Sequence, residues 1–84
     1  MQKDEYAKAF GAHLKSLLEE KGMTQAEFAR RTGLTEPAVS RYIKGERIPR
    51  MLQAYRIACA IGVDMNTLTY LGKGEKHDPF HNTD

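Results

Sequence analysis

Apolar residues recur along most of the chain at the three- and four-residue spacing of an amphipathic α-helix. The first such stretch is residues 4–21, in which four apolar side chains share one helical face: Phe10, Leu14, Leu17 and Leu18. No segment alternates convincingly between apolar and polar residues with the period of two that a half-buried strand shows. The pattern therefore predicts an all-α fold.

Polar capping residues divide the next part of the chain into two short helices. Thr24 followed by Glu27 is the capping-box pattern of a helix start, so we expect a second helix over residues 25–32. Thr35 can cap a third helix over residues 36–44 in the same way.

Two more helices are expected beyond a short loop. Pro49 is placed to open a fourth helix, because proline suits the first helical turn. The inward face of that helix carries four apolar residues: Ala54, Ile57, Ala58 and Ile61. Asp64 can cap a short fifth helix over residues 65–71, with Leu68 turned inward. The chain thus predicts a compact five-helix domain.

The length and composition suit one globular domain with a single modest core, which we expect over residues 1–71. Residues 72–84 have little to bury and are expected to form a flexible tail or a linker. No apolar run reaches the length of a membrane span, and the acidic start MQKDEYAKAF lacks a signal-peptide block. We expect a cytoplasmic protein with no membrane association.

Charge is distributed unevenly along the chain. Residues 30–56 hold seven basic and two acidic residues, a net charge of +5, while the whole chain carries +2 and the remainder therefore −3. A basic middle between acidic ends favours a polyanion-binding face. A solvated surface of mixed charge would have the same composition, so charge alone does not decide.

Residues 25–44 meet three steric requirements of a helix-turn-helix. The first helix of the pair needs a small inward residue, which is Ala29, and the turn needs a residue that tolerates positive φ, which is Gly33. The second helix of the pair needs apolar residues on its inner face, which are Val39 and Tyr42, while Phe28 and Leu34 close the core from the other side. This set is a strong signal because a capping box precedes it and a basic loop follows it.

These residues resemble the lambda-repressor/Cro-like helix-turn-helix family, also called the XRE family. The resemblance covers about residues 6–71, and its core is GMTQAEFARRTGLTEPAVSRYIKGERIP followed by IACAIGV. It implies a five-helix DNA-binding domain whose third helix enters the DNA major groove. It also implies binding as a homodimer, at least on DNA, to a near-palindromic operator.

The resemblance and side-chain chemistry together assign expected roles in DNA binding. Arg41 is the best base reader, because its guanidinium matches guanine O6 and N7 in the major groove. Ser40, Glu36 and Pro37 are the other expected base-reading residues, and Pro37 would act through shape or an apolar contact. The expected phosphate-binding residues are Gln25, Thr35, Lys44, Arg47 and Arg50.

Two positions depart from the family. Members usually have an Arg four residues before the glycine that ends the first helix and a Glu two residues before the glycine that ends the third, and these form an ion pair. Here the two positions are Leu18 and Ile43. We predict that they pack on each other, since an apolar pair avoids the cost of desolvating two charges.

Several reactive residue types are expected to be structural only. Cys59, the one cysteine, is expected to be a buried core residue, and His13 a surface residue. His77 and His81 are four residues apart, but Pro79 lies between them and no third ligand is evident, so no metal site is expected. No spacing of acidic, serine or histidine residues suggests catalysis, and we expect neither an enzyme nor a cofactor.

The sequence therefore predicts a sequence-specific double-stranded DNA-binding protein, a bacterial or prophage transcriptional repressor that occupies its operator. Two alternatives remain open: an antitoxin that also regulates its own operon, and a protein-interaction module that has lost DNA binding. A steep fall of affinity for random duplex DNA with salt would separate DNA binding from the interaction module. An antitoxin would co-purify with a partner from its operon.

Overall fold

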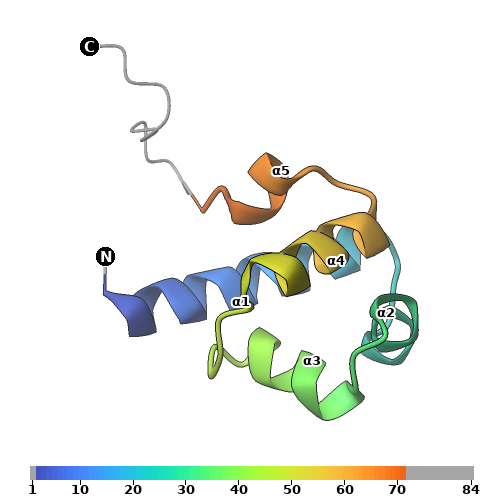
Figure 1. The fold of residues 1–84 in the computed structure, drawn as a ribbon, viewed down its shortest axis with the longest axis horizontal. Helices are drawn as coiled ribbons and strands as arrows, with labels where there is room; N and C mark the ends of the chain where they lie inside the picture. Colours follow the sequence, from blue (N-terminus) through green and yellow to red (C-terminus); the bar gives the residue numbers. More distant parts are fainter. Residues whose placement is uncertain (1, 72–84) are drawn as a thin grey trace.

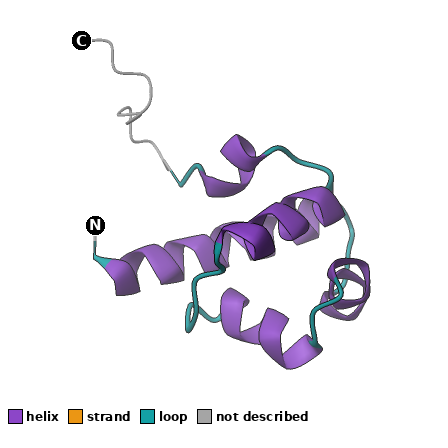
Figure 2. Cartoon of the chain, in the orientation of Figure 1, coloured by secondary structure: helices purple, strands orange, loops and turns teal. Residues whose placement is uncertain are grey.

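The computed structural model describes residues 2–71, which form five helices and, over that range, no strand (Figures 1 and 2). In chain order the helices are α1 (Lys3–Glu20), α2 (Gln25–Thr32), α3 (Glu36–Ile43), α4 (Met51–Ile61) and α5 (Met65–Thr69). The predicted all-α, five-helix architecture is confirmed. The predicted tail, residues 72–84, lies outside the described residues.

Short polar side chains start three of the helices, as predicted. The Thr24 hydroxyl accepts a hydrogen bond from the amide three residues on at 3.1 Å, and the Thr35 hydroxyl does the same at 3.2 Å. The Asp64 carboxylate caps α5 in this way at 2.7 Å. The capping box of α2 is only half formed, because the Glu27 carboxylate accepts from the Arg31 guanidinium at 2.9 Å.

Several helix ends differ from the prediction, and α1 spans Lys3–Glu20 rather than residues 4–21. α4 begins at Met51 rather than at Pro49, with Arg50 in extended conformation as its N-cap. Ile48 and Pro49 are half-buried, so the chain continues as an anchored loop before it turns into the helix. α3 and α5 end one and two residues earlier than predicted, because the local sequence does not distinguish a last turn from a cap.

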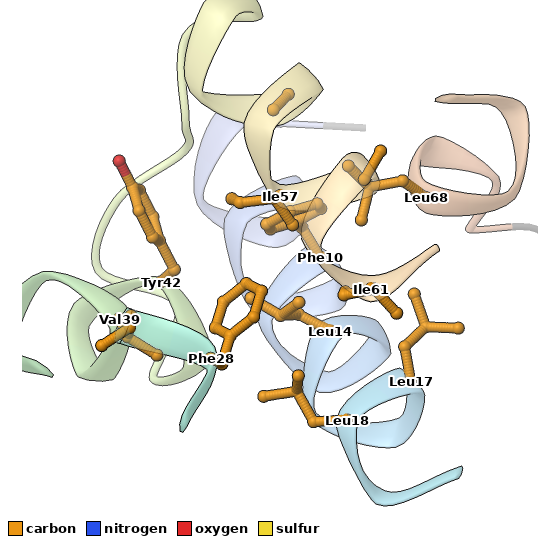
Figure 3. Packing of buried hydrophobic residues seen from close by; sticks show 13 residues of the cluster. Phe10, Leu14, Leu17, Leu18, Phe28, Val39, Tyr42, Ile57, Ile61 and Leu68 are labelled. Atoms are coloured by element: carbon orange, nitrogen blue, oxygen red, sulfur yellow. The ribbon is translucent and has the colours of Figure 1, made fainter. Parts of the chain in front are cut away.

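The core gathers apolar side chains from all five helices around α1. In Figure 3, Phe10 and Leu14 of α1 point into the same buried cluster as Phe28 of α2 and Ile57 of α4. The largest fully buried side chains are Phe10, Leu14, Phe28, Val39, Ile57 and Leu68. Since Val39 comes from α3 and Phe28 from α2, the same core that stabilises the fold also holds the helix-turn-helix.

α1 and α3 approach each other backbone to backbone at Gly11, which the apolar pattern did not indicate. Gly11 is buried, and a Cβ added there would lie 2.5 Å from the Tyr42 carbonyl oxygen and 2.9 Å from the Ile43 carbonyl carbon. No amino acid other than glycine permits so close an approach, because every other one carries a Cβ. Gly11 therefore sets the depth at which α3 is seated against α1.

Leu18 and Ile43, the two apolar residues that we predicted to pack on each other, both pack against the core. Leu18 is 3% exposed and Ile43 is half-buried against the same cluster. The Ile43 backbone lies beside Gly11, and Leu18 is seven residues further along α1, about 10 Å on. Direct contact between the two side chains stays a prediction.

Candidate nucleic-acid interface

The turn between α2 and α3 has the geometry that the motif requires. Gly33 has a φ of 79°, and its amide donates to the Ala29 carbonyl at 2.9 Å. The buried Thr32 hydroxyl donates to the Phe28 carbonyl at 2.9 Å and accepts from the Leu34 amide at 3.2 Å. The Thr32 hydroxyl thus bonds back to its own helix, and it is not among the buried side-chain atoms of residues 2–71 that lack a hydrogen-bond partner.

The predicted motif core lies where the sequence placed it. Phe28 and Val39 are fully buried, Ala29 and Tyr42 are 4% and 7% exposed, and Leu34 packs half-buried against the same cluster. With Val39 and Tyr42 pointing inward, the opposite face of α3 is left for solvent. In Figure 1, α3 lies along the lower edge of the molecule, and no labelled helix covers its outer side.

The outward face of α3 presents the side chains that we predicted to read bases. Glu36, Pro37 and Arg41 are exposed, and Ser40 is half-buried. Pro37 occupies the first turn, one residue after the start of the helix, where an amide has no intrahelical acceptor. The proline therefore costs no hydrogen bond, and its ring is part of the exposed face.

The basic residues that follow this face form no ion pair with any residue in the described range 2–71. Lys44, Arg47 and Arg50 are exposed, and the single ion pair found among residues 2–71 involves none of them. That ion pair joins Arg31 to Glu27 on α2 at 2.9 Å. Arg31 is therefore partly neutralised, whereas the loop cations remain available for an anion.

The end of α3 is fixed by a Schellman motif. The Glu46 amide donates to the Arg41 carbonyl at 2.9 Å, and the Gly45 amide donates to the Tyr42 carbonyl at 3.1 Å. Gly45 has a φ of 80°, which favours glycine. This turn gives the loop a defined exit from α3.

Lys8 of α1 lies beside this turn, and no signal in the sequence indicated it. A Cβ added at Gly45 would lie 2.8 Å from the Lys8 Cα and 2.9 Å from its Cγ. Lys8 is exposed, and its backbone lies beside Gly45, the residue that follows Lys44 at the C-terminal end of α3. Only the packing of α1 on the loop brings a lysine so far away in sequence to this place.

Two helix N-termini complete the surface. Gln25 is the first residue of α2 and is exposed, and Thr35 caps α3 while its hydroxyl keeps a proton to donate. Free amides and the helix dipole make such termini favourable for phosphate. An exposed reading face, unpaired cations and two helix N-termini are the features of a DNA-binding surface.

Comparison with known proteins gives the same result. The helix-turn-helix family model HTH_3 matches residues 14–68. The chain belongs to the HTH_3 helix-turn-helix family. It is an HTH-type transcriptional regulator that binds DNA, and this family relationship accords with the absence of any catalytic pattern in the sequence.

A comparison with an individual protein extends the likeness. The chain is 36% identical, over 56 residues, to the uncharacterized HTH-type transcriptional regulator y4dJ of Sinorhizobium fredii (strain NBRC 101917 / NGR234). That match covers 67% of this chain and 73% of y4dJ.

Two crystal structures show how far the fold agrees. The restriction-modification controller protein C.AhdI from Aeromonas hydrophila matches with a TM-score of 0.72 and 26% identity, covering 74% of this chain and 94% of C.AhdI. The clp gene regulator ClgR from Corynebacterium glutamicum matches with a TM-score of 0.75 and 21% identity, covering 86% and 94%. The lambda-repressor-like fold is therefore confirmed.

Two residues of the HTH_3 domain lie differently from our expectation. Cys59 is exposed rather than buried, and the pKa of Tyr55 is raised mainly by a hydrogen bond with the Cys59 thiol. His13 is half-buried, and its Nε2 lies 2.7 Å from the Thr67 carbonyl oxygen, which joins α1 to α5. The His13 contact depends on tertiary packing that the local sequence does not encode, whereas the exposure of Cys59 follows from its position on α4 away from the buried face.

The described part of the chain contains neither a candidate metal-ligand cluster nor a membrane-spanning helix. Residues 2–71 contain no group of three or more His, Cys, Asp and Glu side chains placed to hold a metal ion. None of the five helices is long and apolar enough to cross a bilayer. His77 and His81 lie outside the described residues.

Proposed function

We propose that the protein is a repressor, of bacterial or prophage origin, that acts in the cytoplasm by occupying an operator. The observation that supports this most is the outward face of α3, which is exposed and is followed by cations free of ion pairs. Such a face can enter the major groove while the cations hold phosphates on either side. Occupancy then excludes polymerase or a second regulator.

Within this proposal each exposed residue has a distinct task. Arg41 reads a guanine, and Ser40 and Glu36 contact neighbouring base edges. Pro37 offers an apolar surface that suits a thymine methyl group. The phosphate-binding set is Gln25, Thr35, Lys44, Arg47 and Arg50, to which we add Lys8.

Two copies on a near-palindromic operator are part of the proposal. One small domain buries limited DNA surface, so a single copy binds weakly. Two copies on half-sites about one helical turn apart add their contacts.

Selection of bound sequences from a random duplex pool tests the proposal. We expect a consensus with two inverted half-sites, and transcription from a promoter that contains this consensus should fall as protein is added. No enrichment, or binding that does not weaken as salt rises, would overturn DNA recognition. Enrichment without an effect on transcription would overturn the repressor role alone.

A matched pair of variants tests the assignment of the loop cations. Arg47→Ala and Arg31→Ala each remove one positive charge, but only Arg31 is held by a carboxylate. We expect Arg47→Ala to weaken binding to all sequences alike and to lower the salt slope by about one, with Arg31→Ala having the smaller effect. Equal losses in the two variants would mean that net charge, rather than the loop, governs binding.

A further inference from the structure

α4 is apolar around more of its circumference than the core uses. Its inward face consists of Ala54, Ile57, Ala58 and Ile61, all buried. Three large apolar side chains on the same helix are instead exposed: Met51 at 81%, Leu52 at 61% and Tyr55 at 57%. We call these three residues the α4 patch.

The α4 patch is a continuous surface rather than three scattered side chains. At about 100° of rotation per residue, Met51, Tyr55 and Leu52 fall within an arc of roughly 100° directly beside the buried face. No acidic residue occurs anywhere on α4. The patch therefore lies open at the surface without a carboxylate beside it on its own helix.

The α4 patch lies close to the proposed DNA-binding surface. It occupies the first turns of α4, immediately after the basic loop of residues 44–50. In Figure 1 the start of α4 and the end of α3 lie on the same side of the molecule, and α4 runs across the front of α1. A neighbour seated on the patch would thus stand beside α3 and along the DNA.

We propose that the α4 patch is the contact between two copies of this chain bound to adjacent half-sites, and that the contact forms on DNA rather than in the free protein. This inference rests on the proposed function. An apolar patch can pair with its own copy across a two-fold axis, because such an interface uses the same surface on both sides. That symmetry matches the inverted half-sites of a near-palindromic operator.

The size of the α4 patch indicates why free copies should stay apart. Taking about 200 Å² for each fully exposed large side chain, the patch offers on the order of 400 Å². A stable interface buries about 800 Å² per partner. The patch is therefore sufficient to add to binding on DNA but too small to hold a dimer at low protein concentration.

Charge also disfavours pairing of the α4 patch between free copies. Arg50 and Arg56 flank the α4 patch, and neither belongs to the ion pair seen in the described residues. Two copies brought together in solution would place these like charges near each other, which is unfavourable. On DNA the phosphates between the half-sites compensate them, so the same contact costs less.

Cooperativity measurements on designed DNA test the proposal. The full chain is titrated onto duplexes that carry one or two selected half-sites, and its mass without DNA is measured by analytical ultracentrifugation. We expect a monomer at micromolar concentration and a second copy that binds about 10-fold or more tightly than the first. A variant with Leu52→Gln and Tyr55→Gln should lose this cooperativity while keeping its affinity for one half-site within about twofold.

The control variant is Ser16→Gln, which introduces the same glutamine side chain at an exposed position of α1 without removing an apolar group. It should keep full cooperativity. Cooperativity that survives in the patch variant, or a wild-type chain that binds its two half-sites independently, would overturn the α4 patch as the copy-to-copy contact. So would a stable dimer in solution that the patch variant leaves intact. Failure of the wild type to bind even one half-site would instead overturn the proposed function.

Discussion

Replacing Gly11 with alanine should destabilise the domain, although alanine is the better helix former. In an ordinary helix interior the change Gly→Ala gains about 1 kcal/mol of stability. At Gly11 the added Cβ would lie 2.5 Å from the Tyr42 carbonyl oxygen and 2.9 Å from the Ile43 carbonyl carbon, and these are backbone atoms that no rotamer change can move. The sign of the effect therefore tests how closely α1 and α3 pack.

The loss of stability in Gly11→Ala can be estimated from how far the two helices must separate to admit the added Cβ. Restoring ordinary contact requires α1 and α3 to separate by about 1 Å, and overpacking of this kind costs about 1–3 kcal/mol or more. Because the clash is with backbone atoms, we take the upper end of this range, about 3 kcal/mol, and subtracting about 1 kcal/mol of helix propensity leaves a net loss of about 2 kcal/mol. In a domain of this length that loss corresponds to a fall in Tm of roughly 10 °C.

Thermal and urea unfolding followed by circular dichroism measure this directly. The matched control is Ala12→Gly, the opposite change at an exposed position of the same helix, which should lose about 1 kcal/mol from propensity alone. Because α3 is seated through Gly11, Gly11→Ala should also weaken DNA binding. A Gly11→Ala protein as stable as the wild type, or more stable, would refute the close approach of the two helices.

Three further predictions concern single contacts. The Thr67 amide holds the pKa of Asp64 below its ordinary value of 3.8, so the cap stabilises the fold above that pH and this stability is lost as the pH falls through the lower pKa of the folded state. The Tm difference between wild type and Asp64→Ala should therefore shrink below pH 4, and a difference that stays constant would contradict this prediction. Leu18→Arg alone should lower the free energy of unfolding by about 3 kcal/mol, because it buries a charge. If the two positions touch, adding Ile43→Glu should recover more than about 0.5 kcal/mol of that loss, whereas additive losses would exclude contact. His13→Ala should cost about 1 kcal/mol and speed hydrogen exchange in α5, and unchanged exchange would mean that the bond to Thr67 does not hold α5.

Local chemistry in the sequence predicts most of the helix starts and the whole helix-turn-helix. Thr24, Thr35 and Asp64 all cap helices, because a short side-chain oxygen satisfies amides within its own turn whatever packs around it. The inward positions of α3 were predictable for a similar reason, since Val39 and Tyr42 follow the helical period.

Two of the features that were missed, the roles of Gly11 and Lys8, depend on contacts between distant parts of the chain, whereas the third, the exposure of Cys59, follows from the helical period. Gly11 has no positive φ and no turn beside it, so only the approach of α3 explains why a glycine stands at this position. Lys8 joins the basic loop through the packing of α1 on Gly45. Cys59 was assigned to the core from its apolar neighbours, but it lies about 200° around the helix from the buried Ile57.

The most direct test of the central claim, that the outward face of α3 reads DNA sequence, is the affinity of Arg41→Ala for the selected operator and each of its single-base variants. We predict a loss of discrimination at one guanine position, worth about 1–3 kcal/mol, with preferences elsewhere unchanged. Lys44→Ala, the matched control on the same helix end, should weaken binding to every sequence equally and lower the salt slope by about one. An Arg41→Ala protein that keeps the wild-type preference at every position would contradict the account.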